Sequence, residues 1–206
     1  MKKLLSLVFC ILVGISVFAQ KEDVNAIKNV YATYAEAMAN KNAEEALRYV
    51  TASSVKYYTK LLTLSKTADS ATLAAMPIVD ILYTLSLWVR IDASLLCEMN
   101  SGEDLLSYSL RESKNNTENQ IGDITVQGDT AYVDVENVPI PMEKQYQYRF
   151  VRESTGWKID LTQQASVLSQ QFEELMKQYH SSKQELYKFM MSMSHMPETT
   201  WEPACK

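Results

Sequence analysis

One carboxylate stands inside an apolar run in the middle of the chain. Residues 78–91 are apolar on nearly every side of a helix and are interrupted by Asp80 and three other polar residues. A carboxylate that is desolvated in such a helix has a raised pKa and can act as a general base. Asp80 also fits a structural role, either on the less buried side of the helix or in an ion pair with Arg90 or Arg149. Asp80 is therefore the candidate catalytic residue, with a structural alternative.

Aromatic residues are the second set that could form a site. The chain has 12 tyrosines and 3 tryptophans. Their rings could stack on a small apolar ligand inside a cavity while the hydroxyl groups orient it. At helical and strand spacing the same side chains could equally be core. The candidate ligand-binding residues are Tyr34, Trp88, Tyr148 and Trp157, with Tyr31, Tyr58 and Tyr146 as neighbours.

The other reactive residue types form no recognisable site. His180 and His195 are fifteen residues apart and, with so few cysteines, supply no cluster of metal ligands. The sequence has no glycine-rich phosphate loop and no Gly-x-Ser-x-Gly motif. The formal net charge of −5 argues against a nucleic-acid partner, which needs a basic face. We expect no metal, no cofactor and no nucleic acid.

The start of the chain has the layout of a secretory signal peptide. Two lysines precede an apolar run over residues 4–18, and the small residues Ser16 and Ala19 are suitably spaced for cleavage. The run is short for a membrane span, and charged residues follow it at once. We expect residues 1–20 to be a signal peptide and the mature protein to be exported, periplasmic or secreted, with a net charge of −7 and no membrane span.

Cys97 and Cys205 are the cysteines that remain after removal of the signal peptide. In an oxidising compartment they could form a disulfide that ties the C-terminal tail to the helical part of the chain. The alternative is two free thiols, with Cys97 buried beside Leu95 and Leu96.

Helical periodicity dominates the first half of the chain. Apolar residues recur every three or four positions from Val24 to Met38, with Asp23 available as a cap. Further helices are expected at 43–49, from residue 55, after Asp69, over 78–91, and from positions 92 and 103. Pro77 suits the first position of the helix over 78–91.

Residues 121–161 predict a β-meander. Ala131, Val133 and Val135 share one face by alternation, as do Tyr146, Tyr148 and Phe150, and Trp157, Ile159 and Leu161. Gly128-Asp129 and residues 154–156 supply the turns. A sheet with one apolar face needs a covering layer, so we expect the helix over 78–91 to lie across it.

Helices followed by a bent meander that ends in Gly-Trp-Lys-Ile-Asp-Leu resemble the NTF2-like (cone-shaped, cystatin-like α+β) superfamily, particularly its small exported bacterial members of unknown function. The resemblance covers residues 23–162 and rests on the helix over 24–38, the strand entry at 128–133 and the final strand at 157–160. It implies an α+β fold in which several N-terminal helices pack on a bent antiparallel sheet, with a C-terminal helical extension. The implied boundaries are 21–162 for the domain and 163–206 for the extension.

The same resemblance leaves function open, because this fold hosts isomerases, dehydratases, binding modules and protein-interaction domains. Its enzymes place an Asp or His inside the cone, and both histidines of this chain lie outside the matched region. We expect a non-enzymatic protein that binds a small apolar ligand or a protein partner. The alternatives are an isomerase- or dehydratase-like enzyme that uses Asp80 or a tyrosine, and a scaffold protein that acts through its C-terminal helix.

The C-terminal helix, expected over 165–196, carries a heptad seam of large apolar residues. A long helix of this kind could bind a partner or form a homodimer, and methionines at 190, 191, 193 and 196 suit an adaptable contact. The alternative is a bend at His180-Ser181-Ser182 that packs both halves on the chain's own domain. The seam positions are Leu168, Phe172, Leu175, Tyr179, Ser182, Leu186, Phe189 and Met193.

Overall fold

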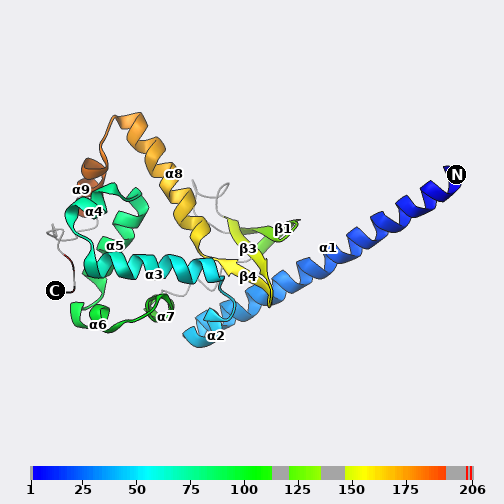
Figure 1. Cartoon of the computed structure of the whole chain (residues 1–206), viewed down its shortest axis with the longest axis horizontal. Coiled ribbons are helices and arrows are strands. Elements are labelled where there is room, and N and C mark those ends of the chain that lie inside the picture. Colours follow the sequence, from blue (N-terminus) through cyan, green and yellow to red (C-terminus); the bar gives the residue numbers. More distant parts are fainter. Residues whose placement is uncertain (1, 113–120, 136–146, 194–202, 204, 206) are drawn as a thin grey trace. The chain divides into compact units, whose positions relative to one another are not determined.

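The computed structural model describes residues 2–112, 121–135, 147–193, 203 and 205, with side chains from residue 20 onward except those of residues 70, 187 and 190–193. The chain forms two compact units: a sheet unit of residues 1–51 and 114–160, and a helical unit of residues 52–113 and 161–206. Figure 1 labels their helices and strands. The predicted α+β class is confirmed. The domain boundaries at 21–162 and 163–206 stay predictions.

The sheet unit is built on a four-stranded antiparallel meander in the order β1-β2-β3-β4. Its strands are β1 (Ile121–Gln127), β2 (Thr130–Val135), β3 (Gln147–Glu153) and β4 (Gly156–Asp160). Ala131 lies opposite Phe150, and Phe150 lies opposite Ile159. Alternation therefore predicted the buried face correctly. The buried residues of that face are Ala131, Val133, Val135, Phe150, Trp157 and Ile159.

Two predicted residues of the meander are not part of its described strands. Leu161 follows the end of β4, and Tyr146 lies outside the described residues. Both predicted turns are present: Gly128 has φ +64° between β1 and β2, and Gly156 has φ +115° where β4 begins. Glycine adopts such positive φ values without the steric cost that a Cβ atom brings.

Helix α1 (Lys2–Ala39) contacts β1 and β4 of the sheet unit. Ile27 and Ala37 of α1 are buried. Asp23 was expected to cap this helix, but it lies within α1, and its carboxylate instead accepts a hydrogen bond from Trp157 Nε1 at 3.1 Å. A cap needs a free helix N-terminus at that residue, and here the helix begins much earlier, at Lys2.

A short segment after α2 (Ala43–Leu47) completes the edge of the sheet. Asn42 caps α2 by accepting a hydrogen bond from the backbone N–H of Glu45 at 3.2 Å. Val50 then forms a parallel bridge with Ile159. The Ile159 N–H donates to the Tyr49 carbonyl at 2.7 Å, and the Thr51 N–H donates to the Ile159 carbonyl at 2.9 Å. These bonds satisfy polar backbone groups on the outer edge of β4.

The helical unit contains seven labelled helices, most with an N-cap that the sequence signals. Asp69 accepts a hydrogen bond from the Thr72 N–H, and Asp92 accepts one from the Ser94 N–H, so the helices expected after Asp69 and from position 92 are present and begin at aspartate caps. Pro77 is one residue earlier than predicted, at the N-cap. The helices are α3 (Ala52–Thr67), α4 (Ser70–Ala75), α5 (Ile78–Arg90), α6 (Ala93–Glu98), α7 (Gly102–Glu112), α8 (Thr162–Tyr179) and α9 (Lys183–Met193).

Helix α5 lies at the centre of the helical unit. It packs against α3, α8 and α9, and its buried residues Ile78, Ile81 and Leu85 contact Ala165 and other residues of α8 and α9 in one core. The expected position of this helix across the sheet stays a prediction. Within the sheet unit, the helix that contacts β1 and β4 is α1.

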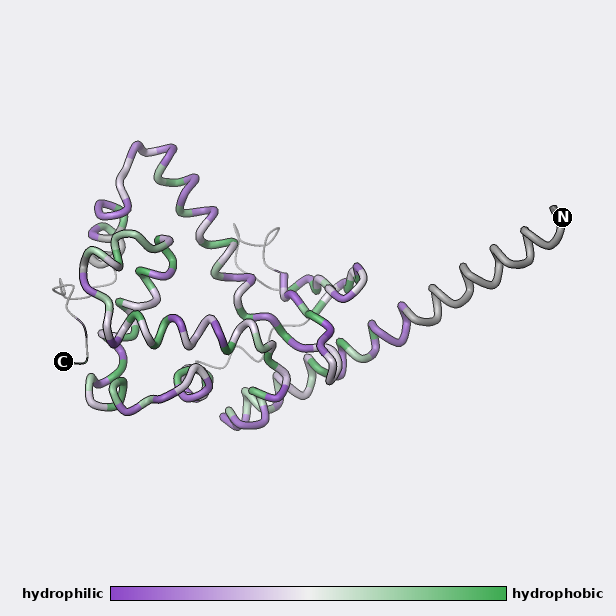
Figure 2. Tube along the Cα trace, viewed as in Figure 1, coloured by the Kyte–Doolittle hydropathy of each residue, from purple (hydrophilic) through white to green (hydrophobic). Residues whose placement is uncertain are grey.

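Helices α8 and α9 are separated by a break at the predicted place. His180 adopts a left-handed conformation (φ +50°), and the Ser181 N–H donates to the Met176 carbonyl at 3.0 Å, which ends α8. Ser182 and Glu185 then form a reciprocal capping box that starts α9. Figure 2 shows hydrophobic and hydrophilic residues alternating along α3 and α8, as expected for half-buried helices.

Candidate functional site

Asp80 is buried and carries two strong polar contacts. Tyr57 Oη donates a hydrogen bond to Asp80 Oδ1 at 2.7 Å, and Lys60 Nζ lies 2.6 Å from Oδ2. The Asp80 side chain is 7% exposed, and that of Lys60 is 46% exposed. The ion pair was anticipated with Arg90 or Arg149, but Lys60 is the partner, while Arg90 is exposed in the last turn of α5. Asp80 thus joins α5 to α3.

Tyrosines surround this ion pair. Burial, and after it the hydrogen bond to Asp80, raises the pKa of Tyr57 above its ordinary value. Burial also raises the pKa of Tyr58 to about 12. Burial and then the charge of Asp80 raise the pKa of Tyr83, whose ring lies 6.5 Å from that of Tyr57. The three phenols therefore stay protonated near neutral pH.

The Asp80 cluster holds the groups needed for proton transfer, but both of its carboxylate oxygens are engaged within the protein. Sequence reasoning missed Tyr57 and Lys60, which lie three residues apart on one face of α3. That spacing was the available signal, because residues at i and i+3 meet on a helix surface. The arrangement links two helices directly. Catalysis by Asp80 stays a prediction.

Asp160 forms a second buried ion pair, in the sheet unit. Arg149 and Asp160 are directly opposite on β3 and β4. Arg149 donates to Asp160 Oδ2 from Nε at 2.9 Å and also from its terminal nitrogen Nη2. The Asp160 side chain is only 2% exposed, against 30% for Arg149. A guanidinium that reaches one carboxylate through two nitrogens is a strong, geometrically specific contact.

The four candidate ligand-binding aromatics are divided between the two units. Trp157 is buried, donates to Asp23 and lies under the Arg152 guanidinium, 4.6 Å from the ring centroid. Tyr148 packs beside Tyr31 with ring centroids 5.6 Å apart, and Tyr34 is half-buried in the same unit.

Trp88, the fourth aromatic candidate, belongs to the helical unit. Its Nε1 donates to the Ser65 carbonyl at 2.6 Å, and its ring packs beside buried residues of α3 such as Leu64. These contacts are those of packing residues. Ligand binding by the four aromatics stays a prediction.

Cys97 and Cys205 are bonded to each other, so the predicted disulfide is present in the structure. Lys66 supports the same region: its Nζ donates to the Cys97 carbonyl at 2.9 Å and to the Met99 carbonyl. The Cys205 N–H also lies 3.4 Å from the Lys66 carbonyl. The crosslink joins α6 to a residue near the C-terminus.

The described part of the chain contains no metal site and no helix that could span a membrane. No group of three or more His, Cys, Asp or Glu side chains among the described residues could hold a metal ion. Within the same residues, no helix is both long enough and apolar enough to cross a bilayer. His195 lies outside the described residues.

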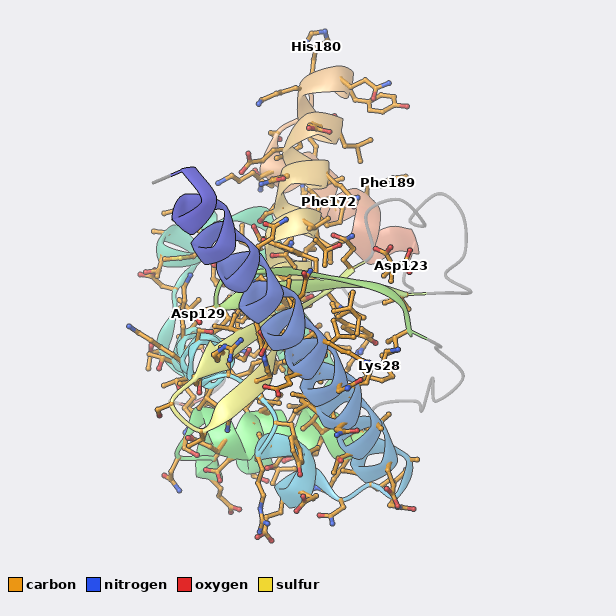
Figure 3. All side chains as sticks on the ribbon, turned by 90° about the vertical axis from the view of Figure 1, so that its right-hand side faces the viewer. Lys28, Asp123, Asp129, Phe172, His180 and Phe189 are labelled. Carbon is orange, nitrogen blue, oxygen red and sulfur yellow. A yellow bond between two sulfur atoms is a disulfide. The ribbon has the colours of Figure 1, made fainter. Side chains whose placement is uncertain are left out.

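The predicted seam of α8 and α9 is divided between core and surface. Leu168, Phe172 and Leu186 pack on the core around α5, which is the packing expected if the helix bends. Leu175 and Tyr179 remain 38% and 66% exposed, and Phe189 is 61% exposed. Figure 3 labels Phe172, His180 and Phe189 along the two helices. The side chain of Met193 and those of Met190, Met191 and Met196 lie outside the described residues.

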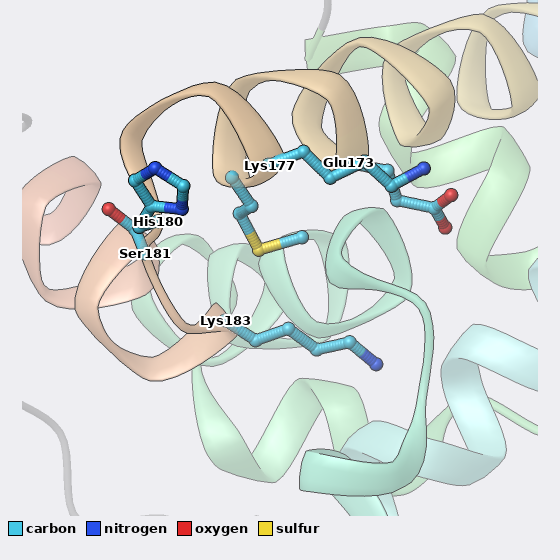
Figure 4. Close-up of a pocket in the computed structure, with 6 residues that line it drawn as sticks. Glu173, Lys177, His180, Ser181 and Lys183 are labelled. Carbon is cyan, nitrogen blue, oxygen red and sulfur yellow. The ribbon is translucent and has the colours of Figure 1, made fainter.

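An open hollow lies at the turn between α8 and α9, close to the exposed end of the seam. Its volume is about 550 Å³, and Met176 lines it together with Lys177 and Lys183, which Figure 4 labels. Lys183 is held at the rim because its Nζ donates to the Met76 carbonyl at 2.9 Å. We did not predict this hollow. Its lining residues are Glu173, Met176, Lys177, His180, Ser181 and Lys183.

In comparisons with known proteins, no protein-family model, no curated protein and no solved structure matches the chain.

Proposed function

We propose that this protein is exported and binds a protein partner without catalysis, through the end of α8 and the start of α9. The observation that carries the proposal is the exposure of Tyr179, which lies three residues after Met176 of the hollow and is therefore its neighbour on the surface of α8. Large apolar and aromatic side chains on a surface are the residues that dominate binding energy when a partner covers them. The binding surface comprises Met176, Lys177, Tyr179 and Lys183.

The shape of this surface favours a protein segment over a small apolar ligand. Pockets for small molecules enclose most of the ligand, whereas this hollow is wide open to solvent. The aromatics proposed as ligand-binding residues are engaged with the protein itself: Trp157 with Asp23, and Trp88 with Ser65. A helical or extended segment could lay apolar side chains against Tyr179 and Met176.

Charge indicates the chemistry of that partner. Lys177 and Lys183 flank the hollow against a single carboxylate, Glu173, in a chain whose net charge is −5. A segment that carries carboxylates beside its apolar side chains would complement these two lysines. The partner is therefore an acidic, amphipathic protein segment.

The proposal includes export and an NTF2-like origin of the sheet unit. A disulfide between Cys97 and Cys205 is typical of proteins that fold in an oxidising compartment, which supports export. The four-stranded meander with α1 against β1 and β4 supports the NTF2-like resemblance. In that fold the function lies in whichever site the scaffold presents.

A titration with two designed peptides tests the binding proposal. One peptide alternates leucine and glutamate, and the other replaces each glutamate by lysine. Fluorescence anisotropy should show saturable binding of the acidic peptide alone. Tyr179→Glu should weaken it at least tenfold, equivalent to about 1.4 kcal/mol, because the new charge repels the peptide and removes an apolar contact. Equal binding of both peptides would contradict the proposal.

The matched control is Gln178→Glu, which adds the same charge at a neighbouring exposed position outside the binding surface, two residues from Met176 and so on another side of α8. Its affinity should stay close to that of the wild type. Sedimentation of the wild-type protein should give a monomer. A dimer that Tyr179→Glu dissociates would show that a second copy covers this surface, and would overturn the proposed partner.

A further inference from the structure

The disulfide between Cys97 and Cys205 is accessible to solvent. Both cysteines are only partly buried, and Glu98, the neighbour of Cys97, is exposed. Thiol–disulfide exchange begins when a thiolate attacks one of the two sulfurs, so it requires access to that sulfur. Exposed disulfides exchange more readily than disulfides that are enclosed in a core. This disulfide therefore meets the first requirement for exchange with a thiol in solution.

The protein holds the two cysteines to different degrees. Cys97 lies in the last turn of α6, beside the fully buried Leu96, and its carbonyl accepts a hydrogen bond from Lys66 Nζ at 2.9 Å. Among the residues that the structure describes, Cys205 makes one hydrogen bond, from its backbone N–H to the Lys66 carbonyl at 3.4 Å. When the disulfide opens, Cys97 is therefore held in place by α6, whereas Cys205 is held only by this long hydrogen bond.

The ammonium group of Lys66 lies beside Cys97. Its Nζ donates to the carbonyls of Cys97 and Met99 at the C-terminal end of α6. A neighbouring ammonium stabilises a thiolate. It also offsets the negative end of the helix dipole, which would disfavour a thiolate there. In an exchange, the sulfur that leaves more readily is the one whose thiolate is better stabilised. Cys97 is therefore the better leaving group of the two cysteines.

We propose that Cys205 is a modification site for low-mass thiols, and that Lys66 directs the exchange to it. The thiolate of the incoming molecule attacks Sγ of Cys205 and forms a new S–S bond. The bond between the two cysteines breaks, its electron pair stays on Sγ of Cys97, and Cys97 leaves as a thiolate beside Lys66. One disulfide replaces another, so the step needs no reactant besides the thiol. The exchange unlinks Cys205 from α6, and the inference does not rest on the proposed binding function.

Peptide mass spectrometry tests the proposal. The disulfide-bonded protein, purified without reductant, is incubated with 2-mercaptoethanol at mildly alkaline pH, and N-ethylmaleimide stops the exchange at early times. This thiol has no other charged group, so Lys66 does not attract it before it ionises. Most chains that carry one mercaptoethanol should carry it on Cys205 and the maleimide on Cys97. The reverse arrangement, an even mixture of the two, or no exchange in the folded protein would overturn the proposal.

Variants of Lys66 separate its charge from its structural contacts. Lys66→Met should slow the formation of the Cys205 adduct by about threefold or more, because the Cys97 thiolate loses its ammonium neighbour. Lys66→Arg keeps the charge and should exchange at close to the wild-type rate. The matched control is Lys56→Met, which removes an exposed charge from the same helix, α3, and should leave the rate unchanged.

The direction of the Lys66→Met effect is decisive. If Lys66 only held the contacts around the disulfide together, its loss would loosen them and speed the exchange. A faster or unchanged rate in Lys66→Met would therefore overturn the proposed role of Lys66.

Discussion

Each compact unit contains one buried aspartate, and the two aspartates are paired in different ways. Asp160 meets Arg149 directly across β3 and β4, within a ladder that fixes both backbones. Asp80 meets Lys60 and Tyr57 across two helices whose distance depends on side-chain packing. The first pair follows from strand register, whereas the second holds only if α3 and α5 keep their separation.

This difference predicts that removing the cationic side chain lowers the free energy of unfolding by a different amount in each pair. Arg149→Met should lower the free energy of unfolding by about 3 to 5 kcal/mol, because the buried Asp160 loses its guanidinium. Lys60→Met should cost about 1 to 3 kcal/mol, because Lys60 is half-exposed and the Tyr57 hydroxyl still donates to Asp80. Urea unfolding of the two variants would measure both costs.

Arg48→Met is the control for that comparison, because Arg48 pairs with glutamates on the surface of α2. Its effect should stay below about 1 kcal/mol, as is usual for exposed ion pairs. If Arg149→Met and Lys60→Met lowered the free energy of unfolding equally, the Arg149–Asp160 pair between strands and the Lys60–Asp80 pair between helices would contribute equally to stability. That result would contradict the predicted difference between the two pairs.

Alkaline pH should destabilise the helical unit through Tyr57, the hydrogen-bond donor to Asp80. The pKa of Tyr57 is raised in the folded protein, so the unfolded chain releases this proton first as the pH rises through about 10, the ordinary tyrosine value. The free energy of unfolding should therefore fall above about pH 10. Tyr57→Phe should lower the free energy of unfolding by about 1 kcal/mol at pH 7, because the hydrogen bond to Asp80 is lost. Above pH 10, the free energy of unfolding of this variant should decline less steeply than that of the wild type.

The exposed Tyr179 offers a matched control for that pH series. Tyr179→Phe should follow the wild-type decline, because this side chain makes no buried contact to lose. Chemical denaturation at several pH values between 8 and about 11 would give the slopes. Parallel slopes for Tyr57→Phe and the wild type would contradict the raised pKa of Tyr57, which burial and then the hydrogen bond to Asp80 cause.

The sheet unit was more predictable from sequence than the helical unit. Ala131, Val133 and Phe150 reveal their face because strand side chains alternate with a period of two, whatever the rest of the fold does. Gly128 likewise marks its turn locally, because glycine readily adopts the positive φ that this turn requires. The Lys60–Asp80 pair could not be predicted from periodicity, because two helices that are apolar on several faces can meet in many rotations.

In the C-terminal helices, the residues predicted from a 3.5-residue heptad repeat differ from the residues that a straight helix buries. A heptad seam selects Leu175 and Tyr179, whereas the core face of α8 passes through Leu168, Phe172 and Met176. A straight helix repeats every 3.6 residues and drifts from a 3.5-residue seam by about 20° per heptad. The seam therefore leaves the core before α8 ends, and its last residues reach the surface proposed for the partner.

Hydrogen exchange with and without the acidic peptide tests the proposed binding surface most directly. The account predicts slower exchange of backbone amides in residues 172–186, around the turn between α8 and α9, with no change in β1 to β4. In Tyr179→Glu the same peptide should protect neither region. Protection confined to the strands around Tyr148 and Trp157 would contradict the account, because it would place the binding site in the sheet unit.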